Sequence, residues 1–277
     1  MGFKKSGRVV VITGGATGIG KEIALLYAGA GHDVAIISRN TGALELAHRD
    51  LSRYLSGEQK TQYFVGDVTD KQSIKKALKE VLAFFGQVDT LILSAGGGAP
   101  GYFEDHSEQR FRDYFELNFF GTLYPVQEVL PQMKERGSGK IVIISSGAAL
   151  MGIFGNAAYG SSKFAVRGLG ETLRWECRPF RVQVSMAYPP VTDTPMYHRN
   201  KDLKTWENKL IVNKNKAFPV DKVAKSIYKG IEKGKPVITT GASLYFLYRV
   251  GGALMPLVHW YFDRKIMAGR KKRGLSA

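Results

Sequence analysis

The chain has 277 residues, of which 44% are hydrophobic and 23% charged, a composition typical of a globular protein with a core of its own. A single cysteine, Cys177, excludes an internal disulfide, and five scattered histidines show no metal-ligand spacing. We therefore predict a protein of a reducing compartment, with Cys177 as an inert core thiol and with no bound metal.

The net charge of +16 is concentrated in the C-terminal quarter of the chain. No helix-turn-helix signature and no interleaving of basic and aromatic residues accompany this charge, so we do not predict a nucleic-acid partner. Anionic lipid headgroups or an acidic carrier protein would suit it better. No positively charged start followed by an apolar run precedes "GRVVVITGG", which favours a cytoplasmic location.

The first 190 residues alternate short apolar runs with segments of helical periodicity. Strands are predicted over residues 8–15, 33–39, 61–68, 88–98, 140–146 and 181–190. Helices are predicted over residues 21–31, 43–55, 71–86 and 108–137, and around "AYGSSK" at 158–163. Fully apolar strands that alternate with helices indicate a parallel sheet covered on both faces. The predicted fold class is therefore α/β, a single doubly wound, Rossmann-type domain.

The chain beyond residue 190 adds to this domain. A polar segment over about residues 193–217 is too long for an ordinary connection and predicts a lid or a partly helical insertion. A helix over 221–234 and a last strand over 235–240 follow. We therefore assign residues 1–240 to the Rossmann-type catalytic domain and residues 241–277 to an apolar and basic extension.

The apolar part of that extension, residues 242–262, is about long enough to span a bilayer. Arg249 and Pro256 interrupt it, and an arginine near the middle of a span is unfavourable, so we do not predict a transmembrane helix. Two alternatives stay open. One is an interfacial segment anchored by Trp260, Tyr261 and the basic residues that follow, and the other is a helix packed on the domain or on a second subunit.

A glycine-rich turn, "TGGATGIG", follows the first predicted strand and opens the first predicted helix. Its glycines allow a tight turn, close backbone approach to a pyrophosphate and close helix packing, while the first helix amides attract phosphate charge. In the context of strand, turn and helix, the pattern predicts dinucleotide binding. The candidate residues are Gly14, Thr17, Gly18, Ile19 and Gly20.

The end of the second predicted strand carries Arg39 where an NAD enzyme would carry an acid for the ribose 2′-hydroxyl. Because a guanidinium can grip a 2′-phosphate through two hydrogen bonds, we predict NADP(H) as the cofactor. Asp67, followed by Val68 after the third strand, could accept a hydrogen bond from the adenine amino group. A turn-capping role for Asp67 is the alternative.

The motifs "TGGATGIG", "LILSAGGG", "ELNFFG", "VIISS" and "AYGSSK" resemble, in order and spacing, those of the short-chain dehydrogenase/reductase family over residues 8 to about 195. The resemblance implies a catalytic set of Asn118, Ser146, Tyr159 and Lys163. It also places Ala95, Tyr159, Lys163, Thr192 and Thr194 at the cofactor. The family often pairs through the helices that bear Asn118 and Tyr159, so we expect a homodimer or tetramer.

The same resemblance assigns each catalytic residue a role. Tyr159 would donate a proton to the reduced carbonyl oxygen, and the Lys163 ammonium would lower the pKa of its phenol from about 10 and hold the nicotinamide ribose. Ser146 would hydrogen-bond the substrate oxygen, and Asn118 would position a water that resupplies the proton. Two departures from the family pattern are Leu93 and Ser94 in place of two asparagines, and "PP" at 189–190 in place of Pro-Gly.

Two further segments, residues 152–176 and 184–197, resemble a branch of the family that reduces lipid ketones with NADPH at a membrane. A lipid ketone is therefore the expected substrate, and the apolar, basic extension suits an enzyme on the cytosolic face of a membrane. The alternatives are another apolar ketone, such as a 3-oxoacyl chain or a steroid, and a catalytically silent nucleotide-binding regulatory protein.

Overall fold

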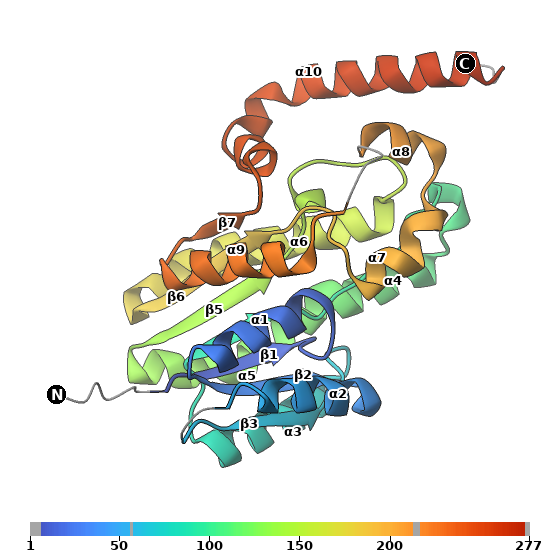
Figure 1. Ribbon diagram of the computed structural model, residues 1–277. Coiled ribbons are helices and arrows are strands. Elements are labelled where there is room, and N and C mark those ends of the chain that lie inside the picture. The colour runs from blue at the N-terminus through green and yellow to red at the C-terminus, as the bar shows by residue number, and fades with distance from the viewer. Residues whose placement is uncertain (1–6, 56–57, 213–216, 275–277) are drawn as a thin grey trace.

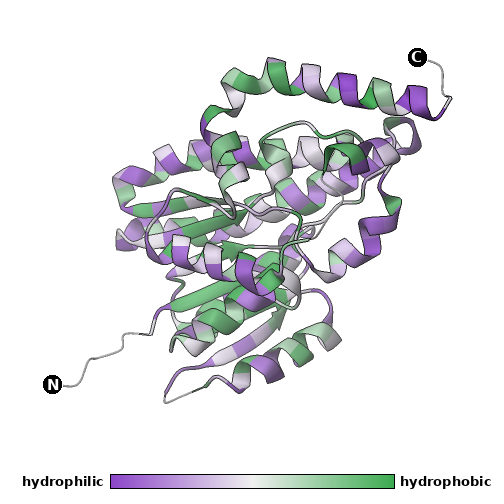
Figure 2. Cartoon of the chain, turned by 45° about the horizontal axis from the view of Figure 1, so that its top comes forward, coloured by the Kyte–Doolittle hydropathy of each residue, from purple (hydrophilic) through white to green (hydrophobic). Residues whose placement is uncertain are grey.

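The computed structural model describes residues 7–55, 58–212 and 217–274, and its centre is a seven-stranded parallel sheet (Figure 1). The strand order is β3-β2-β1-β4-β5-β6-β7, which confirms the predicted α/β, doubly wound class. The strands are β1 (Val9–Thr13), β2 (Asp33–Ser38), β3 (Thr61–Val65), β4 (Thr90–Leu93), β5 (Gly139–Ile144), β6 (Val182–Tyr188) and β7 (Val237–Thr239). Figure 2 shows these strands as mostly apolar, as a sheet covered on both faces requires.

Helices cover both faces of the sheet, and alternate residues of each strand supply the two halves of the core. On one face Val10 and Ile12 pack with α1 (Gly18–Gly29), α2 (Thr41–Ser52) and α9 (Val220–Glu232). On the other face Val9 and Val11 belong to the core packed under α3 (Lys71–Phe85), α5 (Gly121–Arg136) and α6 (Ala157–Cys177). Cys177 is a free, fully buried thiol of this second core.

Side-chain caps fix where several helices begin. The Asn40 side chain accepts from the Ala43 amide at the start of α2, and Asp70 accepts from the Gln72 and Ser73 amides at the start of α3. α3 ends at Gly86, whose φ of 82° lies in the left-handed region that favours glycine. The polar residues between the apolar runs thus set the lengths of the elements.

The strand order reverses direction between β1 and β4, because β2 and β3 lie on one side of β1 while β4 to β7 lie on the other. Connections on either side of this point leave opposite faces of the sheet, which opens a crevice at the carboxyl ends of β1 and β4. The predicted glycine turn follows β1, and the "SAGGG" segment follows β4, so both meet at this crevice.

The helix predicted over 108–137 is interrupted. It consists of α4 (Glu108–Phe115), a π-helical turn (Glu116–Phe120) and α5. A π-turn adds a residue to the helical repeat and redirects the side chains within it. The polar segment predicted as an insertion contains α7 (Pro195–Asn200) and α8 (Trp206–Ile211), and residues 213–216 of it lie outside the described residues.

The C-terminal extension forms one long helix, α10 (Ala242–Lys272), which contacts the rest of the molecule near both ends (Figure 1). Near its start the Tyr248 ring stacks on Tyr188, with ring centroids 5.8 Å apart. Near its end Gly269 is buried against Trp206 of α8, and the Arg273 guanidinium lies 4.3 Å from the centroid of the same Trp206 ring. The helix therefore packs on the domain at two separate places.

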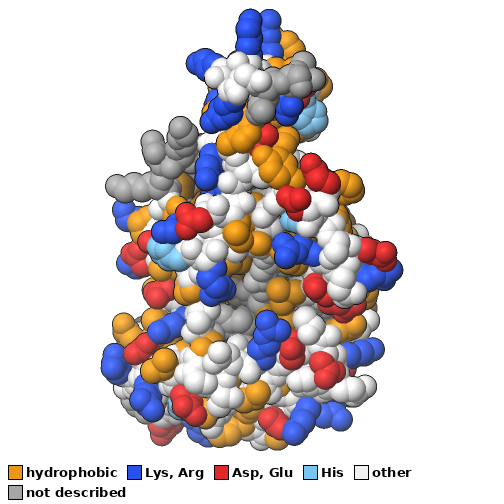
Figure 3. All heavy atoms as spheres, turned by 90° about the vertical axis from the view of Figure 1, so that its right-hand side faces the viewer, with side chains coloured by type: hydrophobic (Ala, Val, Ile, Leu, Met, Phe, Trp, Pro, Cys, Tyr) orange, Lys and Arg blue, Asp and Glu red, His pale blue; other side chains and the backbone are white. Residues whose placement is uncertain are grey.

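Between those contacts α10 presents apolar side chains to solvent. Leu257 is 65% exposed and Trp260 57% exposed. Figure 3 shows Lys and Arg side chains gathered at the protruding C-terminal end of this helix. Within residues 7–55, 58–212 and 217–274, no helix combines the length and apolarity needed to cross a bilayer. The helix thus has features of both alternatives. Its two ends pack on the domain, and its middle exposes the apolar residues expected of an interfacial segment.

Close packing of α9 on β7 leads to a stability prediction. A Cβ at Gly230 would lie 2.7 Å from the Ile238 side chain, whereas a Cβ at Gly168, exposed on α6, would meet nothing within 4 Å. We expect Gly230→Ala to lower the free energy of unfolding by about 1–3 kcal/mol through overpacking. Gly168→Ala should raise it by about 0.5–1 kcal/mol, because alanine favours a helix. Urea unfolding of the two variants checks both values. Equal changes in the free energy of unfolding would contradict the close packing of Gly230 on Ile238.

Candidate active site

The glycine turn between β1 and α1 lies directly against the segment after β4. Gly14 has a φ of 67°, and a Cβ there would lie 2.7 Å from the Ala95 Cα. A Cβ at Gly20 would lie 2.5 Å from the Gly14 carbonyl oxygen. A side chain at either position would clash with backbone, so glycine there lets the turn pack closely on the segment after β4 and on α1, as a dinucleotide-binding turn requires.

The start of α1 fits the pyrophosphate of such a cofactor. Thr17 precedes the helix, is exposed, and makes no side-chain capping bond, so the first amides of α1 are available to an anion. Ile19 turns inward and packs on the core, which anchors that first turn. Thr194 lies beside it, since a Cβ at Gly18 would lie 3.4 Å from the Thr194 Cγ2.

The two predicted threonines belong to the segment between β6 and α7. Thr192 is buried and its Oγ1 donates to the Pro190 carbonyl oxygen at 2.8 Å. The Thr194 Oγ1 accepts from the Tyr197 amide at 3.3 Å and so caps α7. These bonds hold the segment over the glycine turn, although proline at 190 supplies no backbone donor.

Arg39 and Asp67 meet at the carboxyl ends of β2 and β3. The Arg39 Nη1 lies 3.5 Å from the Asp67 Oδ2, and the Arg39 side chain is 69% exposed. Asp67 Oδ1 accepts from both the amide and the Oγ1 of Thr69, so it caps a turn as the alternative reading of this residue predicted. Burial acts to raise the pKa of Asp67, but the Thr69 hydrogen bonds and the Arg39 charge outweigh it and lower the pKa.

The adjacent Val68 is buried, and its side chain lies against Gly121 at the start of α5. Its side chain therefore faces the core, and its backbone is the part that can meet a cofactor.

The π-helical turn places Asn118 in the interior beside the "GGG" segment. Its Oδ1 accepts from the Gly97 amide at 3.0 Å, and its Nδ2 donates to the Gly97 carbonyl at 2.8 Å and to the Ser162 Oγ at 3.0 Å. Both amide hydrogens are thus used within the protein. A water, the role implied for Asn118 by the family pattern, would have to donate to the remaining lone pair of Oδ1.

Ser146, Tyr159 and Lys163 come together from the end of β5 and the first turns of α6. Ser146 lies close enough to Tyr159 to act on the pKa of its phenol, and the Ser146 Oγ accepts from the Ala148 amide at 3.1 Å. The Lys163 Nζ lies 5.9 Å from the centroid of the Tyr159 ring and donates to the Ile144 carbonyl oxygen at 3.4 Å. A Cβ at Gly96 would lie 2.8 Å from the Asn118 Oδ1 and 3.0 Å from the Lys163 Nζ, so both of these groups lie next to Gly96.

Burial is the largest cause of the pKa shifts of Lys163 and Tyr159. It lowers the pKa of Lys163 to about 8, because the ammonium loses its hydration. It also raises the pKa of Tyr159, and the hydrogen bond with Ser146 opposes that shift without cancelling it. The expectation that Lys163 lowers the phenol pKa is therefore wrong in this structure. The physical reason is that burial removes water from the phenolate and so favours the neutral phenol.

Three residues at this site escaped the sequence analysis. A Cβ at Gly98 would contact the Tyr159 ring, so this position accepts no side chain. Ser162 links Asn118 to α6, since its Oγ accepts from Asn118 and donates to the Tyr159 carbonyl. Asn200 of α7 donates to the Gly98 carbonyl at 2.6 Å. The glycine run was a usable signal for Gly98, whereas nothing in the sequence pointed to Asn200.

The segment with α7 and α8 is tied to both loops that flank the candidate catalytic residues. Glu207 is buried and accepts from the Tyr102 hydroxyl at 3.2 Å, and Asn208 donates to the Phe154 carbonyl at 2.8 Å. Tyr102 lies in the loop after β4, and Phe154 in the loop before α6. The segment therefore covers the crevice and fixes the loops on its two sides.

Comparison with known proteins agrees with this geometry. The family model described as short chain dehydrogenase matches residues 8–205. The chain belongs to the short chain dehydrogenase family. It is accordingly an oxidoreductase that acts on a CH–OH/C=O group with NAD or NADP as its cofactor, and the resemblance found in the sequence is confirmed.

Two curated members of the short chain dehydrogenase family align over most of the chain. The 3-ketodihydrosphingosine reductase of Bos taurus is 34% identical over 253 residues, which are 91% of this chain and 76% of the bovine protein. The protein of the same name from Dictyostelium discoideum is 35% identical over 279 residues, covering 95% of this chain and 83% of its own length.

A solved structure of the same fold is that of an alcohol dehydrogenase from the archaeon Thermococcus sibiricus, complexed with 5-hydroxy-NADP. It is 27% identical, with a TM-score of 0.71, and the alignment covers 84% of this chain and 94% of the archaeal one.

The buried ammonium leads to a pH-dependent prediction. Below pH 8 Lys163 is charged in both the folded and the unfolded protein, so the full penalty of burying it is present. As the pH rises from about 8 to about 10.5, the folded protein has lost this proton while the unfolded chain still holds it, and stability increases.

Lys163→Met removes the buried charge, so we expect the variant to be more stable than the wild type by about 3 kcal/mol at pH 7. The difference should shrink toward zero near pH 10.5. Urea unfolding of both proteins at pH 7 and pH 10 measures it, and a difference that does not change with pH would contradict the assignment.

Proposed function

We propose that this protein is an NADPH-dependent reductase of a long-chain lipid ketone, converting 3-ketodihydrosphingosine to dihydrosphingosine. The observation that carries the reductase interpretation is the burial of Lys163 beside the Tyr159 ring and near Asn118, with Ser146 close enough to act on the Tyr159 phenol. The substrate is supported by the two relatives that bear this activity in their names and align over more than nine-tenths of the chain.

The chain's own residues prepare the carbonyl for reduction. A carbonyl oxygen bound beside Ser146 and Tyr159 accepts a hydrogen bond from each of the two hydroxyls. A reduced nicotinamide held by the glycine turn and Lys163 would supply the hydride that the carbonyl carbon receives. Tyr159, kept protonated by its raised pKa, then gives its proton to the oxygen as negative charge develops there.

Lys163 and Asn118 restore that proton. With a pKa of about 8, Lys163 can hold and release a proton near neutral pH. The open lone pair of Asn118 Oδ1 lies beside the Lys163 Nζ and positions a water that passes the proton onward. Burial of both groups keeps bulk solvent from bypassing this route.

The preference for NADP(H) over NAD(H) rests on Arg39. Its exposed guanidinium lies at the end of β2, where the adenosine ribose of a dinucleotide sits in a Rossmann-type crevice. Its partner Asp67 is already occupied by Thr69, so Arg39 can leave it for a 2′-phosphate at little loss. The archaeal relative complexed with 5-hydroxy-NADP is consistent with this choice.

The proposal includes a place in the cell. The exposed Leu257 and Trp260 on α10, with the basic residues that follow, suit a helix that lies on the cytosolic surface of a membrane. Such a surface is where a long-chain ketone is held. A homodimer or tetramer formed through the helices bearing Asn118 and Tyr159 completes the proposed assembly.

The activity is tested by following NADPH oxidation with detergent-dispersed 3-ketodihydrosphingosine. We expect Tyr159→Phe to lower kcat by about 10²–10⁴-fold, since it removes the proton donor but little else. Tyr63→Phe, on the distant strand β3, is the matched control and should keep its rate. A wild-type protein that binds NADPH but does not turn over this ketone would redirect the search to 3-oxoacyl chains and steroids.

Cofactor choice is tested at Arg39. Loss of charge-assisted hydrogen bonds to the 2′-phosphate in Arg39→Gln should raise the KM for NADPH by about 10–100-fold, while the KM for NADH stays within about twofold. Arg53→Gln, exposed at the end of α2, controls for the loss of one charge. An equal rise in the KM for NADPH and for NADH in Arg39→Gln would mean that this residue does not bind the 2′-phosphate.

A further inference from the structure

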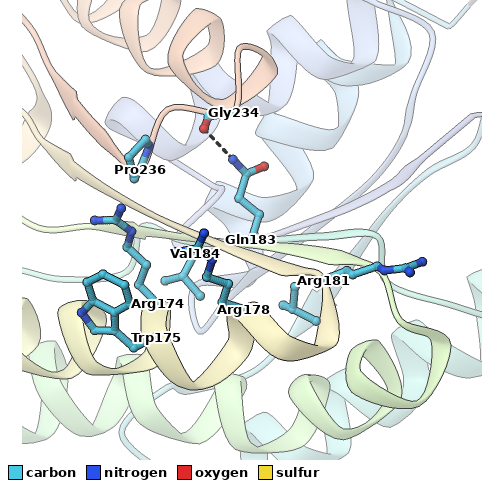
Figure 4. A pocket seen from close by; sticks show the side chains of 9 residues that line it. Arg174, Trp175, Arg178, Arg181, Gln183, Val184, Gly234 and Pro236 are labelled. Atoms are coloured by element: carbon cyan, nitrogen blue, oxygen red, sulfur yellow. Dashed lines mark hydrogen bonds between the residues drawn. The ribbon is translucent and has the colours of Figure 1, made fainter.

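Two adjoining cavities lie at the β7 edge of the sheet. One, of about 410 Å³, lies between the end of α6, the first residues of β6 and the loop before β7 (Figure 4). The other, of about 550 Å³, runs along β7 between α9 and the first turns of α10. Arg174 and Pro236 line both cavities, so together they form one groove, which we call the β7 groove.

The β7 groove is strongly basic. Its cationic lining residues include Arg174, Arg178, Lys229, Lys233, Lys235 and Arg249. Across the described part of the chain, no Asp or Glu lines the groove, and none of these six cations forms an ion pair with a carboxylate. The positive charge of the groove is therefore left uncompensated by the protein.

The cations of the groove repel one another, and Arg174 and Arg249 lie over the Trp175 and Tyr245 rings rather than beside a carboxylate. Arg174 lies in the last turn of α6 and Arg178 is its C-cap residue, so two like charges lie four positions apart at the end of this helix. Figure 4 shows Arg174, from the end of α6, and Arg178, from the turn that follows it, on the side of the loop that ends at Pro236. The helix dipole accounts for a cation at this end of α6, but not for Lys233 and Lys235 on the opposite wall.

Exposed aromatic side chains border the same groove. Trp175 is 62% exposed on the wall formed by α6, and Tyr245 is 55% exposed on the wall formed by α10. Arginine and lysine bind phosphate oxygens, and aromatic side chains beside them settle at the boundary between lipid headgroups and acyl chains. The exposed apolar residues of α10 begin at this groove with Tyr245 and Phe246 and recur at Leu257 and Trp260, which favours a lipid over a soluble anion.

We propose that the β7 groove binds the headgroup phosphate of an anionic phospholipid at a membrane surface. The site is separate from the chemistry, because Tyr159 and Arg174 are fifteen residues apart on α6 and therefore about 22 Å apart along its axis. It adds a second, non-catalytic site to the proposed reductase. Bound lipid would fix the orientation of the protein on the membrane, with α6 connecting the lipid site to the catalytic residues.

The test is sedimentation of the full-length protein with vesicles of phosphatidylcholine alone and with one part in five phosphatidylglycerol. A groove variant carries Arg178→Gln, Lys233→Gln and Lys235→Gln. The matched control carries Arg49→Gln, Lys71→Gln and Lys79→Gln, three exposed cations of α2 and α3 at the other end of the sheet. Because each cation near an anionic surface contributes about fivefold to binding, the groove variant should bind the anionic vesicles about 100-fold more weakly.

The control variant should stay within about fivefold of the wild type on the same vesicles. Equal losses in the two variants would overturn the proposal, since net charge alone would then explain binding, and so would an unchanged groove variant. Thermal stabilisation by millimolar inorganic phosphate that the groove variant loses, without any vesicle effect, would mean a soluble-anion site and would also overturn it. NADPH oxidation with the detergent-dispersed ketone should be unchanged in both variants, so failure here is distinguishable from failure of the proposed reductase activity.

Discussion

The site depends on the burial of the Lys163 ammonium at the carboxyl end of β5. The first turns of α6, the end of β5 and the π-turn with Asn118 must all approach one another to enclose it. The segment after β4 fits between them only because residues 96 and 98 are glycine. A Cβ at Gly96 would clash with Asn118 and Lys163, and a Cβ at Gly98 would clash with Tyr159. An ammonium held this way loses hydration, which brings its pKa close to neutral and makes it useful for proton transfer.

The same packing explains how the covering segment is held. Asn200 reaches the Gly98 carbonyl, while Glu207 and Asn208 reach the loops on either side of the catalytic residues. α8 in turn receives the far end of α10 through Trp206. A chain of contacts thus runs from α10 through α8 to the carbonyl of Gly98, the residue that limits the space beside Tyr159. The exposed face of α10 suits a lipid surface.

Charge in this protein is divided between functions. Arg39 near the cofactor crevice has a carboxylate partner from which it can be released, whereas the cations of the β7 groove have no carboxylate partner in the described ranges. The catalytic ammonium is shielded from both by burial. Arg39, the cations of the β7 groove and Lys163 thus lie at different places on one sheet, where we propose a cofactor phosphate, a lipid phosphate and the substrate oxygen, respectively.

The sequence by itself determined the doubly wound fold, because apolar runs alternating with helical periodicity leave few other arrangements, and capping residues such as Asp70 set where helices start. It also identified the catalytic and cofactor candidates, since joint motifs at fixed spacing are specific. Tertiary structure decided what depends on contacts between distant segments. The π-turn at Asn118, the link from Asn200 to Gly98 and the raised pKa of Tyr159 arise from burial and packing, which no local pattern records. The β7 groove is of the same kind, because α6, α9, β7 and α10 bring its cations together only when the chain is folded.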